Sequence, residues 1–174
     1  MKKKLISIVG ARPQFIKLAP FSKVIRKYFN EVIINSGQHY DGNMAQIFFD
    51  EMGIPEPDYN LGVSTGSHAN QTAKILAEIE PVLIKEKPEC IIVFGDTNTT
   101  FSVSLSCFYN KISVGHVEAG LRTFNLNSPW PEEFNRQITS KLSNFHFAPT
   151  NLSRSNLLNE NFSDKKIIVT GNTI

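Results

Sequence analysis

The chain has 174 residues and a mass of 19.5 kDa, which is enough for one domain with a sizeable hydrophobic core. A formal net charge of +2, with 20% charged residues, argues against binding to nucleic acid or to a membrane surface through a strongly basic patch. The apolar run after the N-terminal lysines stops at Gly10, too early for a signal peptide core or a membrane span, so we expect a cytoplasmic protein.

Short apolar runs alternate with amphipathic stretches along the first half of the chain. Strands are predicted at 5–10 and 31–37, and helices at 12–28, 43–52 and 70–87. Pro13 suits the first turn of the first helix, where its missing N–H group costs nothing. Pro81 is expected to break or kink the long third helix. The segment 53–67 is rich in proline and glycine, and we expect no regular structure there.

The second half continues the alternation. Strands are predicted at 90–96, 112–118, 145–149 and 166–172, and helices at 97–111, at about 131–143 and from about residue 150. Several of these strands are almost entirely apolar, as expected for parallel strands that are buried on both faces. The predicted fold is therefore α/β, with a doubly wound, mainly parallel sheet sandwiched by helices. Cys90 and Cys107 fall in apolar patterns and are expected to be buried thiols, not a disulfide.

Polar and charged residues follow the predicted strands at the points where the strands end. These positions hold Arg12, His39, Asp96 and Glu118. The carboxyl ends of parallel strands share one edge of the sheet, and open α/β sheets bind ligands in the crevice beyond that edge. Helix capping would explain Thr97 or Thr150 at such a position, but not this collection of charges. We therefore predict a functional site at this edge.

The charges at the predicted site are of both signs. Cationic groups for an anionic ligand are Arg12, Lys17 and Arg122, and the N-termini of helices would add to them. Carboxylates are provided by Asp96, Glu118 and Glu132. Buried carboxylates that lie close together have their pKa values pushed apart, which separates acid from base. This mixture suits proton transfer on a phosphorylated substrate.

Simpler interpretations compete at several of these positions. Lys17 is equally compatible with a solvent-facing place on its helix, and Glu133 with Arg136 fits a surface ion pair. His116 and Glu118 share a strand face and, with Asp96, could be read as metal ligands, but their spacing matches no compact metal motif. The sequence also contains neither a P-loop nor a GxGxxG motif. His68 and His146 have no evident partner.

Six motifs in order give the sequence a resemblance to a known family. They are GARPQFIKLAP, SGQHYD, GDTNTT, HVEAGLRT, SPWPEEFNR and TGNT. Together they resemble the non-hydrolysing UDP-N-acetylglucosamine 2-epimerases, from residue 5 to the last residue. The resemblance implies two Rossmann-like domains in a glycosyltransferase-B arrangement, with the active site between them. Residues 1–174 would be the N-terminal domain, and the UDP-binding C-terminal domain would be absent from this chain.

The resemblance also implies a reaction and roles for individual residues. The family removes the proton from carbon 2 of the sugar, expels UDP from carbon 1, and adds UDP back to the 2-acetamidoglucal after reprotonation on the opposite face. It needs no cofactor and no metal, and it supplies nucleotide sugars for cell-surface polysaccharide. Matched by motif, the proton-handling residues are Asp96, Glu118 and Glu132. The substrate-binding residues are Arg12, Lys17, Gln38, His39, His116, Arg122 and Arg136.

Substrate and regulation are less closely defined by the resemblance. The expected ligand is UDP-N-acetylglucosamine or a related UDP-sugar such as UDP-2,3-diacetamido-glucuronate, since the QHYD form also occurs in members that act on such sugars. The segments QHYDGNMAQ and SHANQTAK lack the arginines of the family's allosteric site, so regulation there is expected to be weak or absent. The full-length protein is expected to be a homodimer. Alternatives are other chemistry on the same fold, such as glycosyl transfer or hydrolysing epimerisation, and a non-catalytic domain.

Overall fold

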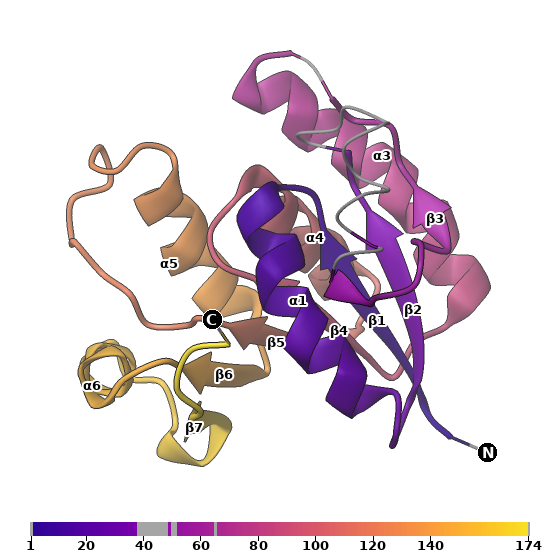
Figure 1. The fold of residues 1–174 in the computed structure, drawn as a ribbon. Coiled ribbons are helices and arrows are strands. Elements are labelled where there is room, and N and C mark those ends of the chain that lie inside the picture. The colour runs from indigo at the N-terminus through magenta and orange to yellow at the C-terminus, as the bar shows by residue number, and fades with distance from the viewer. Residues whose placement is uncertain (1, 38–48, 50–51, 65, 174) are drawn as a thin grey trace.

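The computed structural model describes residues 2–37, 49, 52–64 and 66–173. Its centre is a parallel sheet of seven strands in the order β3-β2-β1-β4-β5-β6-β7 (Figure 1). The strands are β1 (Lys4–Val9), β2 (Asn30–Asn35), β3 (Tyr59–Asn60), β4 (Cys90–Phe94), β5 (Ser113–Val117), β6 (Phe145–Ala148) and β7 (Ile167–Val169). The prediction of a doubly wound parallel sheet is confirmed.

Helices connect the strands and cover the sheet. They are α1 (Arg12–Ile25), α3 (His68–Glu86), α4 (Asn98–Tyr109), α5 (Glu132–Leu142) and α6 (Asn151–Asn159), with a 3₁₀ turn at Asp164–Lys166. Thr97 and Thr150 cap α4 and α6, because each hydroxyl accepts a hydrogen bond from a backbone N–H three residues later. The capping role that the sequence allowed for both threonines is confirmed.

The core forms two layers, one on each face of the sheet. On one face, α1 places Phe15 and Leu18 against side chains of β1, β2 and β4. On the other face, α3 and α4 bury residues such as Ile79 and Val103 against alternate positions of the same strands. Figure 1 shows α1 on the opposite side of the sheet from α3 and α4. This alternation explains why the predicted strands are apolar at nearly every position.

The structure corrects two local predictions. Residues 53–67 are not entirely irregular, because Tyr59 and Asn60 extend the sheet as β3 by pairing with Ile34 and Asn35 of β2. A two-residue strand is too short to give a periodic pattern in the sequence. The helix predicted at 70–87 is not broken, since α3 continues through Pro81. The helix predicted at 43–52 falls mostly outside the described residues.

The strand order creates a switch point between β1 and β4. From β1 the chain builds outward to β2 and β3, and it then returns to add β4 and the later strands on the other side. Neighbouring loops therefore diverge at the carboxyl ends of β1 and β4, which is where open α/β sheets bind ligands. Arg12 follows β1 and Asp96 follows β4 at this point.

Among the described residues, no helix combines the length and the apolar character needed to cross a membrane.

Candidate active site

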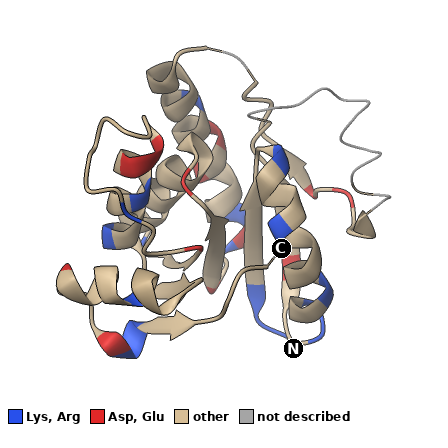
Figure 2. Ribbon diagram, turned by 60° about the vertical axis from the view of Figure 1, so that its left-hand side comes forward, with Lys and Arg blue, Asp and Glu red and all other residues tan. Residues whose placement is uncertain are grey.

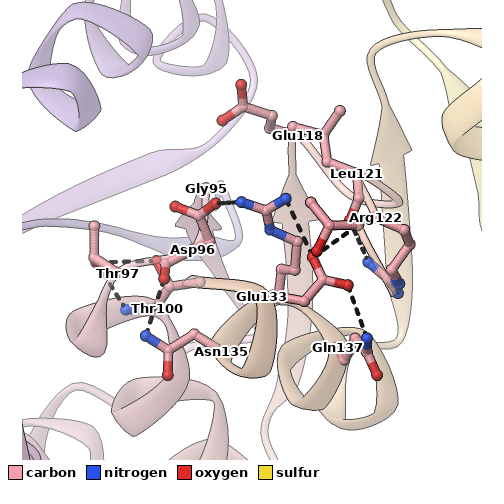
Figure 3. Close-up of polar contacts among 12 residues, drawn as sticks. Gly95, Asp96, Thr97, Thr100, Glu118, Leu121, Arg122, Glu133, Asn135 and Gln137 are labelled. Atoms are coloured by element: carbon pink, nitrogen blue, oxygen red, sulfur yellow. Dashed lines mark hydrogen bonds and ion pairs between the residues drawn. The ribbon is translucent and has the colours of Figure 1, made fainter. Parts of the chain in front are cut away.

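Asp96 lies just beyond the end of β4 and is held from α5. Its carboxylate accepts a hydrogen bond from the guanidinium group of Arg136. Its backbone carbonyl accepts a second bond, of 3.0 Å, from the side-chain amide of Asn135 (Figure 3). Burial raises the pKa of Asp96 above the ordinary value of 3.8, and Arg136 opposes this shift. The carboxylates of Glu118 and Glu132 raise the pKa of Asp96 further.

Two of the carboxylates predicted to handle protons, Glu118 and Glu132, therefore act on the third, Asp96. Asp96 follows β4, Glu118 follows β5, and Glu132 is the first residue of α5. Glu132 is half-buried, and its negative charge is one of the causes that raise the pKa of Asp96. A group of carboxylates in which the pKa of one is raised by burial and by the others is suited to proton transfer.

Glu118 is fixed by its backbone and by an ion pair. Its φ angle of 70° lies in the left-handed region, which is costly for a residue other than glycine and is found disproportionately at functional sites. Its carboxylate accepts a hydrogen bond from the ammonium group of Lys17, which comes from α1 on the other side of the switch point. Lys17 is only 8% exposed. It therefore faces this edge of the sheet and not solvent.

Glycine is required between Asp96 and β4. Gly95 has a φ angle of +68°, and a Cβ atom at this position would lie 3.3 Å from Oε2 of Glu118 and 3.7 Å from Nζ of Lys17. The backbone of the GDT turn therefore lies directly against the Lys17–Glu118 pair. A side chain at Gly95 would displace one of the charged groups or strain the turn.

Glu133 is part of the buried framework, so the interpretation of Glu133 and Arg136 as a surface ion pair was wrong. Its side chain is 0% exposed and lies 3.4 Å from the guanidinium group of Arg136. It accepts hydrogen bonds of 3.0 Å from the backbone N–H groups of Thr123 and Phe124. It accepts another, of 2.8 Å, from the side-chain amide of Gln137 (Figure 3). Burial pushes the pKa of Glu133 upward, but the hydrogen bonds and the cation outweigh burial and bring it below 4.5.

This arrangement makes α5 an organising element of the site. Figure 2 shows acidic residues at the start of α5 and basic residues further along the same helix, the polarity that complements a helix dipole. Glu133 anchors the loop that precedes the helix, and Arg136 connects Glu133 to Asp96. The buried carboxylate of Glu133 therefore fixes Arg136, and Arg136 in turn holds Asp96 in place.

Arg122 pairs with a carboxylate outside the group formed by Asp96, Glu118 and Glu132. Its side chain is 0% exposed and forms a two-pronged ion pair with Glu160, with N–O distances of 2.6 and 3.0 Å. It also donates hydrogen bonds to the carbonyl of Leu121 and to the hydroxyl of Ser140. In the described residues, Arg122 thus links the loop after β5 to α5 and α6. Its predicted contact with a substrate stays a prediction.

His116 and His146 are neighbours on β5 and β6, and both are 0% exposed. Nε2 of His116 lies 2.7 Å from the carbonyl oxygen of Gly95. Burial lowers the pKa of His116 to about 3 and that of His146 to about 4, so both rings are neutral near pH 7. Within the described residues, both nitrogens of His146 lack a hydrogen-bond partner. His116 is therefore buried beneath the turn after β4, and its predicted contact with a substrate stays a prediction.

Gln14 holds together the two sides of the switch point, a role that sequence reasoning missed. Its side-chain oxygen accepts hydrogen bonds from the N–H groups of Gly10 (2.8 Å) and Ala11 (3.0 Å) after β1. Its amide nitrogen donates to the carbonyl of Phe94 (2.8 Å) and to the hydroxyl of Thr97 (3.0 Å) after β4. Glutamine at the third position of a helix usually indicates only a capping box.

A second polar chain supports Asp96 from the side of α3 and α4. Asn135 contacts Oδ1 of Asn98 at 3.3 Å, and Nδ2 of Asn98 lies 2.7 Å from Nδ1 of His68. The His68 ring meets the exposed ring of Trp130 edge to face, with 4.7 Å between their centroids. His68, which had no evident partner in the sequence, thus joins the loop before α5 to the GDT turn.

The remaining predicted residues are placed as follows. Arg12 is the exposed first residue of α1. Gln38 and His39 lie outside the described residues, so their predicted roles stay predictions. Among the residues that the structure describes, no group of three His, Cys, Asp or Glu side chains is arranged to hold a metal ion.

Comparison with known proteins shows which proteins the chain resembles. Residues 23–174 match the UDP-N-acetylglucosamine 2-epimerase family. A UDP-N-acetylglucosamine 2-epimerase of Methanocaldococcus jannaschii is 48% identical over 172 residues, covering 98% of this chain and 46% of the relative. A UDP-2,3-diacetamido-2,3-dideoxy-D-glucuronate 2-epimerase of Pseudomonas aeruginosa is 44% identical over 175 residues, covering 98% and 49%. The chain thus spans about half the length of the curated relatives that it matches.

Solved structures show the same similarity in three dimensions. The structure of the Neisseria meningitidis UDP-N-acetylglucosamine 2-epimerase bound to UDP-N-acetylglucosamine superposes with a TM-score of 0.92 at 43% identity. The match covers 98% of this chain and 47% of that one. The structure therefore has the fold of one half of such an enzyme.

Proposed function

The chain belongs to the UDP-N-acetylglucosamine 2-epimerase family, and from this membership and the geometry of its site we propose that the full-length protein epimerises a UDP-amino sugar at carbon 2. The observation that carries the proposal is the grouping of Asp96, Glu118 and Glu132 with two ion-paired cations at the switch point of the sheet. This chain provides the proton-transfer side of the active site. The half of the relatives that it does not cover would complete the nucleotide site.

The first chemical step is an elimination. A carboxylate of the site removes the proton from carbon 2, the electrons of that C–H bond form a double bond between carbons 1 and 2, and the C1–O bond to UDP breaks. The negative charge that develops on UDP requires cationic stabilisation. Arg12, at the positive end of α1, is the group that we assign to the diphosphate.

The second step reverses the first on the opposite face of the sugar. A protonated carboxyl group donates a proton to carbon 2, and UDP returns to carbon 1. Asp96 is suited to the acid role, since burial and the neighbouring carboxylates raise its pKa. Glu118, held in place by Lys17, is suited to the base role. All bonds and charges balance without a redox partner.

A second substrate is supported by a specific relative. The Pseudomonas aeruginosa enzyme named for UDP-2,3-diacetamido-2,3-dideoxy-D-glucuronate is 44% identical to the chain, close to the 48% of the Methanocaldococcus jannaschii enzyme. The reaction at carbon 2 is the same for both sugars, so the proposed roles of the carboxylates hold for either. The proposal also includes a cytoplasmic location, which the two free cysteines suit, and a homodimeric full-length protein.

The proposal is tested by incubating the full-length protein with each UDP-sugar separately and following the anomeric and carbon 2 protons by NMR. We expect one of the two to be converted to its 2-epimer as an equilibrium mixture. Release of a free sugar would indicate a hydrolysing enzyme, and conversion of neither sugar would contradict the proposal. The 174-residue chain, assayed alongside, is expected to be inactive because it covers about half of its relatives.

A further inference from the structure

We propose that His116 is a positioning residue, which fixes the GDT turn so that Asp96 and Glu118 stand at the right separation for proton transfer. It acts from beneath the site and does not contact the substrate. The consequence for catalysis rests on the proposed function, whereas the positioning itself is a property of the folded chain and is tested separately.

The geometry of Gly95 carries the proposal. The carbonyl of Gly95 can only accept a hydrogen bond, so the 2.7 Å contact requires a proton on Nε2 of His116. The N–H group of the same glycine donates to the carbonyl of Val117 at 3.0 Å. Two consecutive residues of β5 thus hold both polar groups of Gly95, one on each side.

The next residue on each strand is a proton-transfer candidate. Asp96 follows Gly95 directly, and Glu118 follows Val117 directly. The clamp formed by His116, Val117 and Gly95 is therefore one residue away from both carboxylates. A Cβ atom on Gly95 would lie only 3.3 Å from Oε2 of Glu118, so the turn and the Glu118 carboxylate are in close contact. Any shift of the turn therefore changes the position of Asp96 relative to Glu118.

The surroundings of His116 favour a fixed, neutral ring. The ring is 0% exposed, and within the described residues Nδ1 has no hydrogen-bond partner. The nearby titratable and charged groups are His146 on β6, Arg122 after β5 and Arg136 on α5, and all three disfavour a second proton on the ring. The histidine therefore keeps one tautomer and one hydrogen bond while the carboxylates above it exchange protons.

Two amide substitutions distinguish the effect of losing the hydrogen bond to Gly95 from the effect of losing the imidazole ring. In His116→Gln, the side-chain nitrogen can reach about as far as Nε2 of histidine and can still donate to Gly95. In His116→Asn the side chain is one methylene shorter and cannot span the distance. The two variants have the same polarity, so a difference between them reports on the bond. Urea unfolding establishes that each variant is folded before it is compared.

The activity-independent readouts use the 174-residue chain. We expect ¹⁵N NMR of wild-type His116 to show the Nε2–H tautomer with no titration between pH 5 and 8. We expect ¹³C NMR of the Asp96 carboxyl group to give a pKa in His116→Asn that is shifted by about one unit from that of wild type, with His116→Gln unchanged. An imidazole that titrates near pH 6.5, or an Asp96 pKa that is the same in all three proteins, would overturn the positioning role. The wild-type measurements apply even if His116→Asn fails to fold.

The catalytic readout uses the full-length protein. Misplacing a reacting group by about 1 Å can cost about 100-fold in rate, so we expect His116→Asn to lower kcat by about this factor with KM nearly unchanged. His116→Gln should restore kcat to within about fivefold, with the same pH profile as wild type. Equal losses in both variants, with a raised KM or a lost limb of the pH profile, would instead make His116 a substrate or proton-transfer residue. If wild type turns over neither UDP-sugar, the proposed function fails while the NMR results still decide the positioning role.

Discussion

The ammonium group of Lys17 donates a hydrogen bond to the carboxylate of Glu118, although 101 residues separate the two in the sequence. Lys17 comes from α1 on one side of the switch point and Glu118 from the end of β5 on the other. Their side chains are only 10% and 19% exposed, which makes this pair stronger than an ordinary surface ion pair. The contact joins the cationic and the carboxylate parts of the site.

Removing the cation of this pair should therefore impair catalysis. We expect Lys17→Met in the full-length protein to lower kcat/KM by about 100-fold, because a proton-transfer carboxylate loses the partner that orients it. Lys23→Met is the matched control, since Lys23 lies on the same helix but is exposed. The measurement is steady-state turnover of the UDP-sugar. If both variants kept wild-type turnover, Lys17 would have no part in the site.

Loss of charge should affect mainly catalysis at Glu132 and mainly stability at the neighbouring Glu133. Glu132→Gln is expected to lower kcat by at least about 100-fold with little change in stability, as for a general acid–base group. Glu133→Gln weakens a buried carboxylate that holds two backbone N–H groups and Arg136, so the free energy of unfolding should fall by about 2–4 kcal/mol.

Urea denaturation together with turnover measures both effects of this comparison. Each variant serves as the control for the other, because the two glutamates are adjacent and carry the same charge. A stable Glu133→Gln protein combined with an unfolded Glu132→Gln protein would reverse the assignment.

Acid should destabilise the fold through its buried histidines. The pKa values of His116 and His146 are lowered from 6.5 to about 3 and about 4 in the native state. Below pH 6.5 the unfolded chain therefore binds more protons at these two histidines than the native state does. This contribution to stability is complete above pH 6.5 and is lost as pH falls, down to about pH 4 for His146 and about pH 3 for His116, by up to about 1.4 kcal/mol per pH unit for each histidine. The lowered pKa of Glu133 adds a further loss below about pH 4.5.

His146→Leu provides the test of this pH dependence. Within the described residues both nitrogens of His146 are unpaired, so the substitution should leave stability at pH 7.5 nearly unchanged. It should reduce the loss of stability between pH 7.5 and pH 5, measured by urea denaturation, to about half that of wild type. An unchanged pH dependence would show that His146 is not buried in the neutral form.

Gln14 should prove important for stability although it is not a proton-transfer candidate. Gln14→Leu would leave the buried N–H groups of Gly10 and Ala11 without their acceptor. The carbonyl of Phe94 would keep its bond from Thr100. We therefore expect a loss of about 2–4 kcal/mol in the free energy of unfolding, since each unsatisfied buried group costs about 1–3 kcal/mol. An unchanged urea midpoint would contradict the bridging role.

The strand exits could be predicted from the sequence because they depend on two regular features. Parallel strands place their carboxyl ends on one edge, and the apolar runs that end in GARP, GDT and HVE mark where each strand stops. This pattern predicts that Asp96 and Glu118 lie at one edge of the sheet. The structure adds that their charges interact and that Lys17 reaches them from α1.

Side-chain direction at the helix and strand ends could not be predicted in the same way. Glu132 and Glu133 are adjacent in sequence, but successive helix positions differ in direction by about 100°, and only packing decides which of them is buried. For His116, alternation along the strand predicts that it shares a face with Glu118, but not that its side chain is fully buried. The five side-chain hydrogen bonds that Gln14 forms with described residues depend on groups 80 or more residues away as well as on its neighbours, and no local pattern indicates them.

The most direct test of the central claim is incorporation of deuterium at carbon 2 of the UDP-sugar in heavy water, followed by NMR. We expect the full-length protein to place solvent deuterium at carbon 2 of both the substrate and its epimer, and the Asp96→Asn and Glu118→Gln variants to slow this exchange by at least about 100-fold. Epimer formed without solvent deuterium, or wild-type exchange rates in both variants, would contradict proton transfer by these carboxylates.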